Sequence, residues 1–379
     1  MKKEMFGTEI TLLRDTFRRL LRRHAKTNII KLIEKTHPAD MALIFRYFND
    51  SEQDTIFAMM TPSEDTVEFL SELDESISVR LLENETPARI TSILEEASSN
   101  EQAYLMGLVD EEFAASVIDL LQAEEQEELE EMMAYPEDSA GILMHTDAFT
   151  LHEETRAREA ITALQDQAEA EMVFYLYAVD DDGRLTGVVS LRDLVTTPSE
   201  TMLKDIMSKN VHAVRPETDQ EEVARIVSQY NFLAVPVVDS DEQLLGIVTV
   251  DDVVDVIREE ATEDFLKMVG AGEDREILLK SSWDNARMRL PWLFASWVGG
   301  IFAAVIIGIF DNVLQSTIAL AAFIPIIIGM GGNIGTQSST MIVRGLATGR
   351  VDLENSTKIF FKEIRVGLIL GILYGVLLG

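Results

Sequence analysis

The chain has 379 residues, a formal charge of −34 and no cysteine. The length indicates more than one domain, and the lack of cysteine excludes disulfides and thiolate metal sites. The charge is uneven: residues 1–36 sum to +6, residues 37–280 to −42 and residues 281–379 to +2. A region of −42 repels nucleic acid and anionic lipid, so we expect no nucleic-acid partner. Divalent cations would relieve its self-repulsion.

Residues 10–135 are predicted to be entirely helical, because apolar residues recur there at helical spacing. Breaks fall at Thr36-His37-Pro38, Thr61-Pro62-Ser63 and Thr86-Pro87, each with a hydroxyl residue and a proline near the first turn. Short helices at this spacing predict a superhelical stack of helix pairs. The basic start of the chain either touches membrane phosphates or pairs with the acidic body, and the sequence favours neither.

Short β-rich runs begin near Leu143, at 173–179, 185–190, 233–238 and 244–250. Residues 175–194 and 234–253 repeat each other at an offset of 59, each reading strand, acidic turn, strand, Ser/Thr, two residues, Asp, helix. This internal duplication resembles a tandem pair of CBS domains, a Bateman module.

Each copy places a hydroxyl and a carboxylate three residues apart at a helix start: Ser190 with Asp193, and Thr249 with Asp252. One interpretation is a helix cap. The other is a clamp for the ribose of an adenosine nucleotide, which the resemblance to CBS pairs implies. Tyr175 or Phe232 would then lie near the base and Arg192 near the phosphates. The sequence leaves both interpretations open, and favours the first copy for the nucleotide.

A charged helix follows Val253 and leads toward the apolar part of the chain. Asp252, Asp255 and Glu259 follow helical steps of three and four, so they share a face. A solvated linker would explain them, but carboxylates without Cys or His also suit Mg²⁺ or Ca²⁺. We favour metal sensing. The acidic cluster comprises Glu221, Asp251, Asp252, Asp255, Glu259, Glu260, Glu263 and Asp264.

Three membrane spans are predicted, at 290–310, 313–341 and 360–379, with a tight turn at Asp311-Asn312. Trp283 and Trp292 are expected as interfacial anchors. Lys and Arg precede the first span and lie between the second and third, which places the N-terminal part on the cytoplasmic side. Residues with small side chains recur every fourth position in the first and third spans, as in helix bundles.

The second span contains PIIIGMGGNIGTQSSTMIVR, residues 325–344, in which a proline, four glycines and several amide and hydroxyl side chains interrupt an apolar run. Broken backbone at membrane depth is tolerated only against protein or a water-filled cavity. The segment is therefore predicted to line a transport pathway, through Pro325, Gly329, Asn333 and Thr336. Helix packing through the glycines is the alternative. No carboxylate is predicted inside these spans, with Asp311 at an end.

The order of these parts looks like the MgtE family of magnesium channels and transporters. The resemblance covers nearly the whole chain. It is sharpest in YPEDSAGILM (135–144), GIVTVDDVVDVIREEATEDF (246–265) and PIIIGMGGNIGTQSSTMIVRGLATG (325–349). It implies a homodimer in a lipid bilayer with five transmembrane helices per subunit, Mg²⁺ as substrate and regulator, and a connecting plug helix that closes the pore when intracellular Mg²⁺ binds.

The resemblance also assigns residues. Its metal-sensing and plug positions fall on Glu221, Asp252, Asp255, Glu260, Glu263 and Asp264. Its ATP-contacting positions fall on Tyr175, Arg192, Asp193 and Phe232, and its pore asparagine on Asn333. Asn231 stands where the family can have a sensor Asp. The family's pore-binding acid lies on its last transmembrane helix, beyond Gly379, so this chain alone is expected not to conduct.

The expected fold is multi-domain, with an all-α superhelical N-terminal domain, an α/β tandem CBS module and a truncated α-helical transmembrane bundle. The expected parts are 1–140, CBS domains at 141–200 and 201–258, a connecting helix and lead-in at 253–283, and a partial membrane domain at 284–379. We expect a Mg²⁺ transporter of the inner (plasma) membrane with ATP as a second ligand, and no enzyme. The alternatives are a membrane-anchored adenine-nucleotide sensor and a transporter of another divalent cation.

Overall fold

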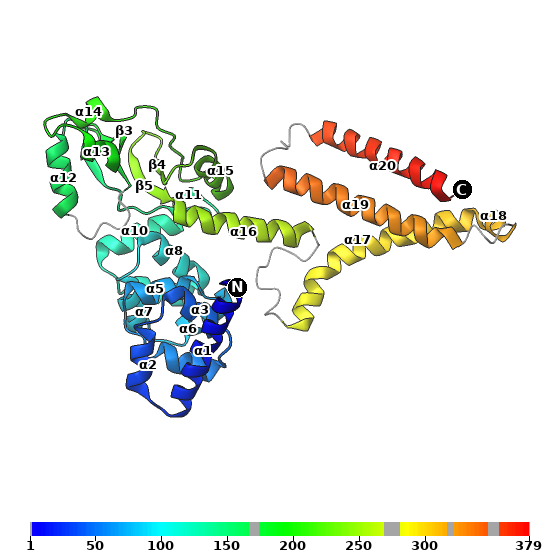
Figure 1. Cartoon of the computed structure of the whole chain (residues 1–379), viewed down its shortest axis with the longest axis horizontal. Coiled ribbons are helices and arrows are strands. Elements are labelled where there is room, and N and C mark those ends of the chain that lie inside the picture. Colours follow the sequence, from blue (N-terminus) through cyan, green and yellow to red (C-terminus); the bar gives the residue numbers. More distant parts are fainter. Residues whose placement is uncertain (1, 167–173, 269–280, 317–321, 348–355, 379) are drawn as a thin grey trace. The chain divides into compact units, whose positions relative to one another are not determined.

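The computed structural model describes residues 2–166, 174–268, 281–316, 322–347 and 356–378. The chain divides into two compact units, Met1–Val256 and Ile257–Gly379 (Figure 1). The first unit contains short helices followed by two small sheets. The second contains long helices.

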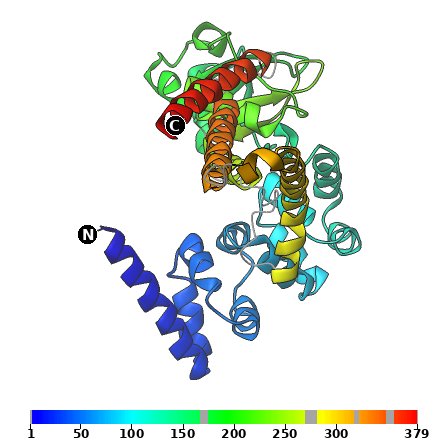
Figure 2. The same cartoon turned by 90° about the vertical axis from the view of Figure 1, so that its right-hand side faces the viewer.

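The N-terminal part of the first unit is a helical stack, as predicted (Figures 1 and 2). Its odd-numbered helices pack in succession, α1 on α3, α3 on α5, α5 on α7 and α7 on α9. The helices are α1 (Lys2–Arg22), α2 (Lys26–Ile33), α3 (Pro38–Phe45), α4 (Asp50–Phe57), α5 (Glu64–Ser71), α6 (Glu75–Glu83), α7 (Pro87–Leu94), α8 (Ser99–Leu108), α9 (Glu111–Ile118) and α10 (Ala123–Met133).

The helices of the stack begin where the sequence predicted breaks. Pro38 and Pro87 each open a helix, where a missing N–H costs no hydrogen bond. His37 caps α3 by accepting from the backbone N–H of Ala39 through Nδ1 at 3.3 Å. Local chemistry therefore sets these boundaries.

Two short strand pairs follow and repeat each other, as the duplication predicted. The antiparallel pairs are β2 (Tyr175–Val179) with β3 (Leu185–Ser190), and β4 (Ala234–Val238) with β5 (Leu244–Thr249). Both have the same register and an irregularity at the same place. The sequence missed β1 (Thr150–His152), a three-residue strand parallel to β2. The accompanying helices are α11 (Ala140–Leu143), α12 (Ala157–Asp166), α13 (Leu191–Thr196), α14 (Leu203–Ile206) and α15 (Gln220–Tyr230).

The second strand pair shares its core with the helical stack, whereas the first pair has a core of its own. Val235 and Val248 of the second pair belong to the same buried cluster as Phe45 and Leu105 of the stack. Leu176 of the first copy belongs to a second buried cluster, which contains no residue of the helical stack. The N-terminal domain and the second CBS copy are thus packed together through apolar side chains.

A segment from outside each copy pairs with that copy's last strand. His145 pairs with Ile247 of β5, through hydrogen bonds of 2.7 and 2.9 Å, and Ser208 pairs with Val188 of β3. A glycine precedes Val188 and Ile247 in their strands because a Cβ atom would not fit there. A Cβ on Gly246 would lie 2.5 Å from the His145 carbonyl oxygen. The segment after α10 is thereby attached to the second copy.

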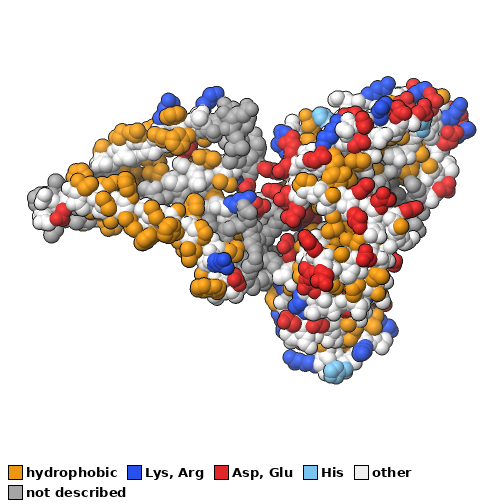
Figure 3. Space-filling model, turned by 180° about the vertical axis from the view of Figure 1, so that it is seen from behind, with side chains coloured by type: hydrophobic (Ala, Val, Ile, Leu, Met, Phe, Trp, Pro, Cys, Tyr) orange, Lys and Arg blue, Asp and Glu red, His pale blue; other side chains and the backbone are white. Residues whose placement is uncertain are grey.

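Helix α16 (Val250–Met268) continues directly from β5. The second unit contains α17 (Ser282–Ile309), α18 (Asp311–Ser316), α19 (Ile324–Ala347) and α20 (Ser356–Leu378). Within the described residues one helix, α17, is long and apolar enough to cross a membrane, with a mean hydropathy of 2.1. Figure 3 shows hydrophobic side chains over these helices and many carboxylates on the first unit. Figure 1 shows α17 bent, and Pro291 inside it explains the bend.

The prediction of broken backbone at residues 325–344 is wrong, because α19 runs through them without interruption. Pro325 is the second residue of α19, where it removes no intrahelical hydrogen bond. The glycines weaken a helix without breaking it. The predicted tight turn at Asp311-Asn312 is instead the start of α18. Residues 317–321 of the second predicted span lie outside the described residues.

Candidate functional site

The first CBS copy presents its hydroxyl–carboxylate pair to solvent. Ser190 caps α13, accepting from the backbone N–H of Asp193 at 3.1 Å and donating to Asp193 Oδ2 at 2.7 Å. Asp193 and the neighbouring Arg192 are exposed. Tyr175 is the cross-strand partner of Ser190, so it lies beside the cap. Three of the four predicted nucleotide-contacting residues are therefore gathered at one end of one strand pair.

The fourth predicted nucleotide residue, Phe232, belongs to a group of rings in the second copy. Its ring stacks on Tyr230 with centroids 5.4 Å apart, and His212 stacks on Tyr230 at 4.3 Å. Asn231 between them ends α15 with φ of 56°, a left-handed conformation that Asn tolerates well. A backbone requirement thus explains asparagine at this position.

The second copy encloses its carboxylate. Asp252 Oδ2 accepts from the backbone N–H of Thr249 at 3.1 Å and from the Thr249 hydroxyl, which is the predicted cap of α16. It also contacts two residues that the sequence did not single out, Asn100 and His145. They lie 152 and 107 residues from Asp252 in the chain. No local pattern could have identified them.

The other predicted metal ligands lie on two helices. Glu221 is in the first turn of α15, and Asp255, Glu260, Glu263 and Asp264 are on α16. Glu263 forms an ion pair with Lys267 one turn further on. Within the described part of one chain, no three His, Asp or Glu side chains converge closely enough to hold a metal ion.

Helix α19 carries all four predicted pathway residues, and Asn333 and Thr336 are exposed on it. The sequence missed a carboxylate beside this helix. Ser338 of α19 donates a hydrogen bond to Glu363 of α20, with Oγ and Oε2 2.6 Å apart. The prediction of no carboxylate inside the spans is therefore wrong, because Glu363 lies within the third predicted span, 360–379, and belongs to α20, which begins at Ser356. A charge pattern alone does not show where such a helix begins.

Tyr177 is a buried polar side chain between the two CBS copies. It is 1% exposed and packs with Ala234 and Ile247 of the second copy. Burial raises the pKa of its hydroxyl well above the ordinary value. The hydroxyl has no hydrogen-bond partner among the described residues. A buried hydroxyl without a partner destabilises the fold.

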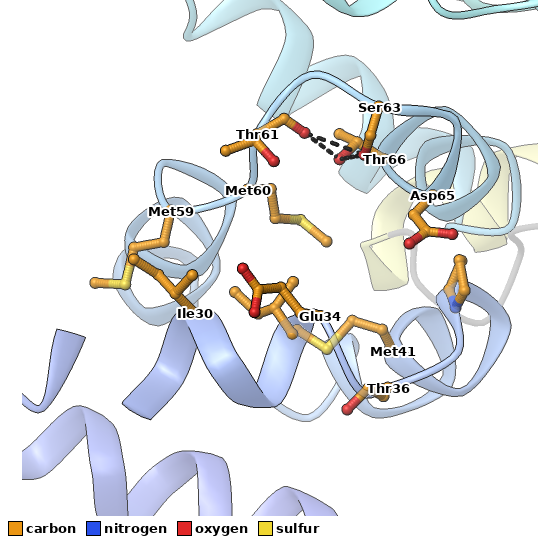
Figure 4. A pocket seen from close by; sticks show the side chains of 12 residues that line it. Ile30, Glu34, Thr36, Met41, Met59, Met60, Thr61, Ser63, Asp65 and Thr66 are labelled. Atoms are coloured by element: carbon orange, nitrogen blue, oxygen red, sulfur yellow. Dashed lines mark hydrogen bonds between the residues drawn. The ribbon is translucent and has the colours of Figure 1, made fainter. Parts of the chain in front are cut away.

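A small cavity of about 80 Å³ lies in the helical stack, away from all the predicted sites. It is bounded by α2, α3 and the start of α5 (Figure 4). Thr66 closes one side by donating to the Thr61 carbonyl at 2.7 Å. The other lining residues include three methionines, Ile30 and Glu34. No sequence motif predicted this cavity.

Three families match successive parts of the chain. Residues 36–138 match the MgtE intracellular N domain, residues 140–200 and 203–259 match the CBS domain, and residues 324–379 match a family described as divalent cation transporter.

Known proteins match most of the chain. A magnesium transporter MgtE of Thermus thermophilus is 37% identical over 92% of this chain and 78% of its own length. One of Bacillus subtilis is 32% identical over 92% of this chain and 77% of its own. The solved cytosolic domain of the Mg²⁺ channel MgtE in complex with ATP covers 64% of this chain and 99% of its own, with 34% identity and a TM-score of 0.61.

A helical acidic domain, a CBS pair and apolar helices follow one another in this chain, in the order of the three matching families, and the last of these is a family of membrane transport proteins. The sequence matches make the assignment specific. The chain belongs to the MgtE family of magnesium transporters. It is a transporter and not an enzyme, as the sequence predicted.

Proposed function

We propose that this protein is a Mg²⁺ channel or transporter for magnesium uptake that intracellular Mg²⁺ closes. Mg²⁺ would bind carboxylates of the soluble unit and of α16, and α16 would act as the plug. The protein would work as a homodimer in the plasma membrane, with its N-terminal domains in the cytoplasm.

The observation that carries the proposal is the continuity of α16. The helix starts at Val250 directly after β5 of the second CBS copy and continues to Met268. Its acidic side chains include the predicted ligands Asp255, Glu260 and Glu263. A rigid helix transmits a displacement of the CBS fold along its length, so binding at one end can move the other.

Repulsion among carboxylates supplies the opening force in this proposal. Like charges at a spacing of three or four residues destabilise a helix, and a bound cation removes that cost. Mg²⁺ keeps several water ligands, so it needs few carboxylates from the protein. Because one described chain gathers no group of three ligands, the proposed sites use carboxylates from a second subunit or from a rearranged domain.

Transport by the complete gene product in liposomes tests this function. We expect Mg²⁺ influx to fall when millimolar Mg²⁺ is present on the side of the soluble unit. The variant Asp255→Asn/Glu260→Gln/Glu263→Gln/Asp264→Asn should conduct at the same Mg²⁺ concentration. Absence of Mg²⁺ flux under all conditions would exclude the transport function.

A matched control removes the same number of charges elsewhere. Glu124, Glu127, Glu130 and Glu131 are exposed glutamates of α10, and replacing all four by glutamine changes net charge equally. We expect this control to keep its response to Mg²⁺. If both variants lose the response together, net charge and not the α16 carboxylates sets gating.

ATP is a proposed second ligand, bound by Tyr175, Arg192, Asp193 and Phe232. The exposed Ser190–Asp193 cap beside Tyr175 supports this, since a carboxylate accepts from both ribose hydroxyls. Titration calorimetry with ATP and GTP tests it. Equal heats for wild type and Asp193→Asn would place any nucleotide site elsewhere.

A further inference from the structure

Residues from three parts of the first unit meet at the Asp252 carboxylate. Asn100 Nδ2 lies 3.1 Å from Asp252 Oδ1, and His145 Nε2 lies 2.9 Å from Oδ2. Thr249 donates to Oδ2 from its own backbone and hydroxyl. The side chains of His145 and Asp252 are 24% and 18% exposed. We call these four residues the Asp252 junction.

The chemistry of the carboxylate fixes the direction of each bond. An ionised carboxylate only accepts hydrogen bonds, so His145 Nε2 must carry the proton that it donates. Asn100 must likewise point its NH₂ group toward Asp252, because the opposite orientation would face oxygen with oxygen. In this orientation Asn100 Oδ1 is buried without a partner in the described part of the chain. The unpaired oxygen is destabilising, and the hydrogen bond from Nδ2 to the charged Asp252 offsets this.

The three parts belong to different elements. Asn100 is in the first turn of α8 of the N-terminal domain, and Asp252 is in the first turn of α16. His145 is in the segment that pairs with Ile247 of β5. The junction therefore joins the helical stack and the CBS fold to the start of the connecting helix.

We propose that Asn100 and His145 are positioning residues that hold the N-terminal domain against the first turn of α16 without a cation. Four donors contact the carboxylate of Asp252, three at Oδ2 and one at Oδ1, and a carboxylate accepts about four hydrogen bonds in all. In this arrangement Asp252 serves as a structural acceptor and not as a Mg²⁺ ligand. The consequence for gating rests on the proposed function, whereas the junction itself does not.

The identity of residue 100 decides whether the junction needs a cation. Asn100 is neutral and donates. An aspartate there would bring a second carboxylate to within hydrogen-bond distance of Asp252, and two such charges repel unless a cation or proton lies between them. The Asn100→Asp variant should therefore make docking of the N-terminal domain dependent on Mg²⁺.

Hydrogen exchange on the complete protein in detergent tests the junction, read at amides in the first turns of α8 and α16. Wild type should be equally protected in EDTA and in millimolar Mg²⁺. Asn100→Asp should exchange about tenfold faster in EDTA, the effect of losing a hydrogen bond to a charged group, and recover in Mg²⁺. Asn100→Leu should exchange faster under both conditions.

Asp193→Asn is the matched control, since Asp193 occupies the equivalent place in the first copy. It should leave exchange in α8 and α16 unchanged. The variants His145→Gln and His145→Leu test the same junction without altering α8. Glutamine retains a donor, so the amides in the first turns of α8 and α16 should stay protected, whereas in the leucine variant they should exchange faster.

Two results would overturn the proposal. One is a wild-type protein in which the amides of the first turn of α16 are protected in Mg²⁺ but not in EDTA. The other is an Asn100→Asp variant that behaves like wild type in EDTA. A wild-type protein protected in EDTA whose transport ignores Mg²⁺ would instead refute the gating function and leave the junction in place.

Discussion

The two CBS copies use the same local motif in different surroundings. Ser190 with Asp193 and Thr249 with Asp252 both open a helix directly after a strand, in strand pairs of the same register. In the first copy the carboxylate is exposed and lies near Tyr175. In the second it receives hydrogen bonds from Asn100 and His145.

The difference comes from what packs against each copy. Ser208 pairs with the last strand of the first copy at the place where His145 pairs with that of the second. The helical stack shares a core with the second copy only. A duplicated cap is therefore either an exposed cap or a structural junction according to its neighbours, with no change in the motif.

The largest expected difference between the two copies is the loss of unfolding free energy when the carboxylate of each is removed. Asp252→Ala leaves the His145 and Asn100 donors unpaired and loses a cap interaction, so we expect a loss of about 3 kcal/mol in the free energy of unfolding. Asp193→Ala keeps the Ser190 cap and should cost about 0.5 kcal/mol. Chemical denaturation of both variants measures this, and equal losses would contradict the assignment of different roles.

Nucleotide affinity should depend on the carboxylate of the first copy and not on that of the second. Asp193→Asn removes an acceptor for ribose hydroxyls, so we expect ATP affinity to fall about tenfold. Asp252→Asn should leave ATP affinity unchanged, because its carboxylate is already hydrogen-bonded within the protein. Calorimetric titration distinguishes the two. A larger loss in the second variant would place the nucleotide in the second copy.

The contact between the copies offers a stabilising change. Tyr177→Phe removes a buried hydroxyl that has no partner among the described residues, so the free energy of unfolding should rise by about 1 kcal/mol. Tyr175→Phe, on the same strand and only half-buried, should change it little. A loss of stability in Tyr177→Phe would indicate that an ordered water satisfies the hydroxyl.

The smallest expected effect is a pH dependence of stability from one exposed ion pair, which joins Glu154 of the first CBS domain to Lys204 at the start of the second. Lys204 donates to Glu154 at 2.9 Å, and this hydrogen bond lowers the pKa of Glu154 below its usual 4.5. A lowered folded-state pKa gives stability that is present above 4.5 and lost as pH falls through the folded value. Lys204→Met should remove this slight acid sensitivity in thermal melts. An unchanged pH profile would show that solvent screens the pair completely.

Much of the fold could be predicted from the sequence because its signals are local. Helix starts at Pro38 and Pro87 follow from proline's missing N–H. The two strand pairs follow from two segments that repeat each other at an offset of 59 residues. The continuity of α19 could not be predicted, since glycine lowers helix stability without deciding the outcome. The contact between Ser338 and Glu363 depends on how two helices pack.

The order of domains can be read from the sequence alone, as can the duplicated hydroxyl–carboxylate motif and the excess of carboxylates, because these are properties of neighbouring residues and of composition. Which copy of the motif is exposed depends on how the domains pack. Asn100 and His145 reach Asp252 from 152 and 107 residues away, so packing of the helical stack on the second copy was required to bring them there. Asp193 lacks such neighbours among its described contacts and stays exposed.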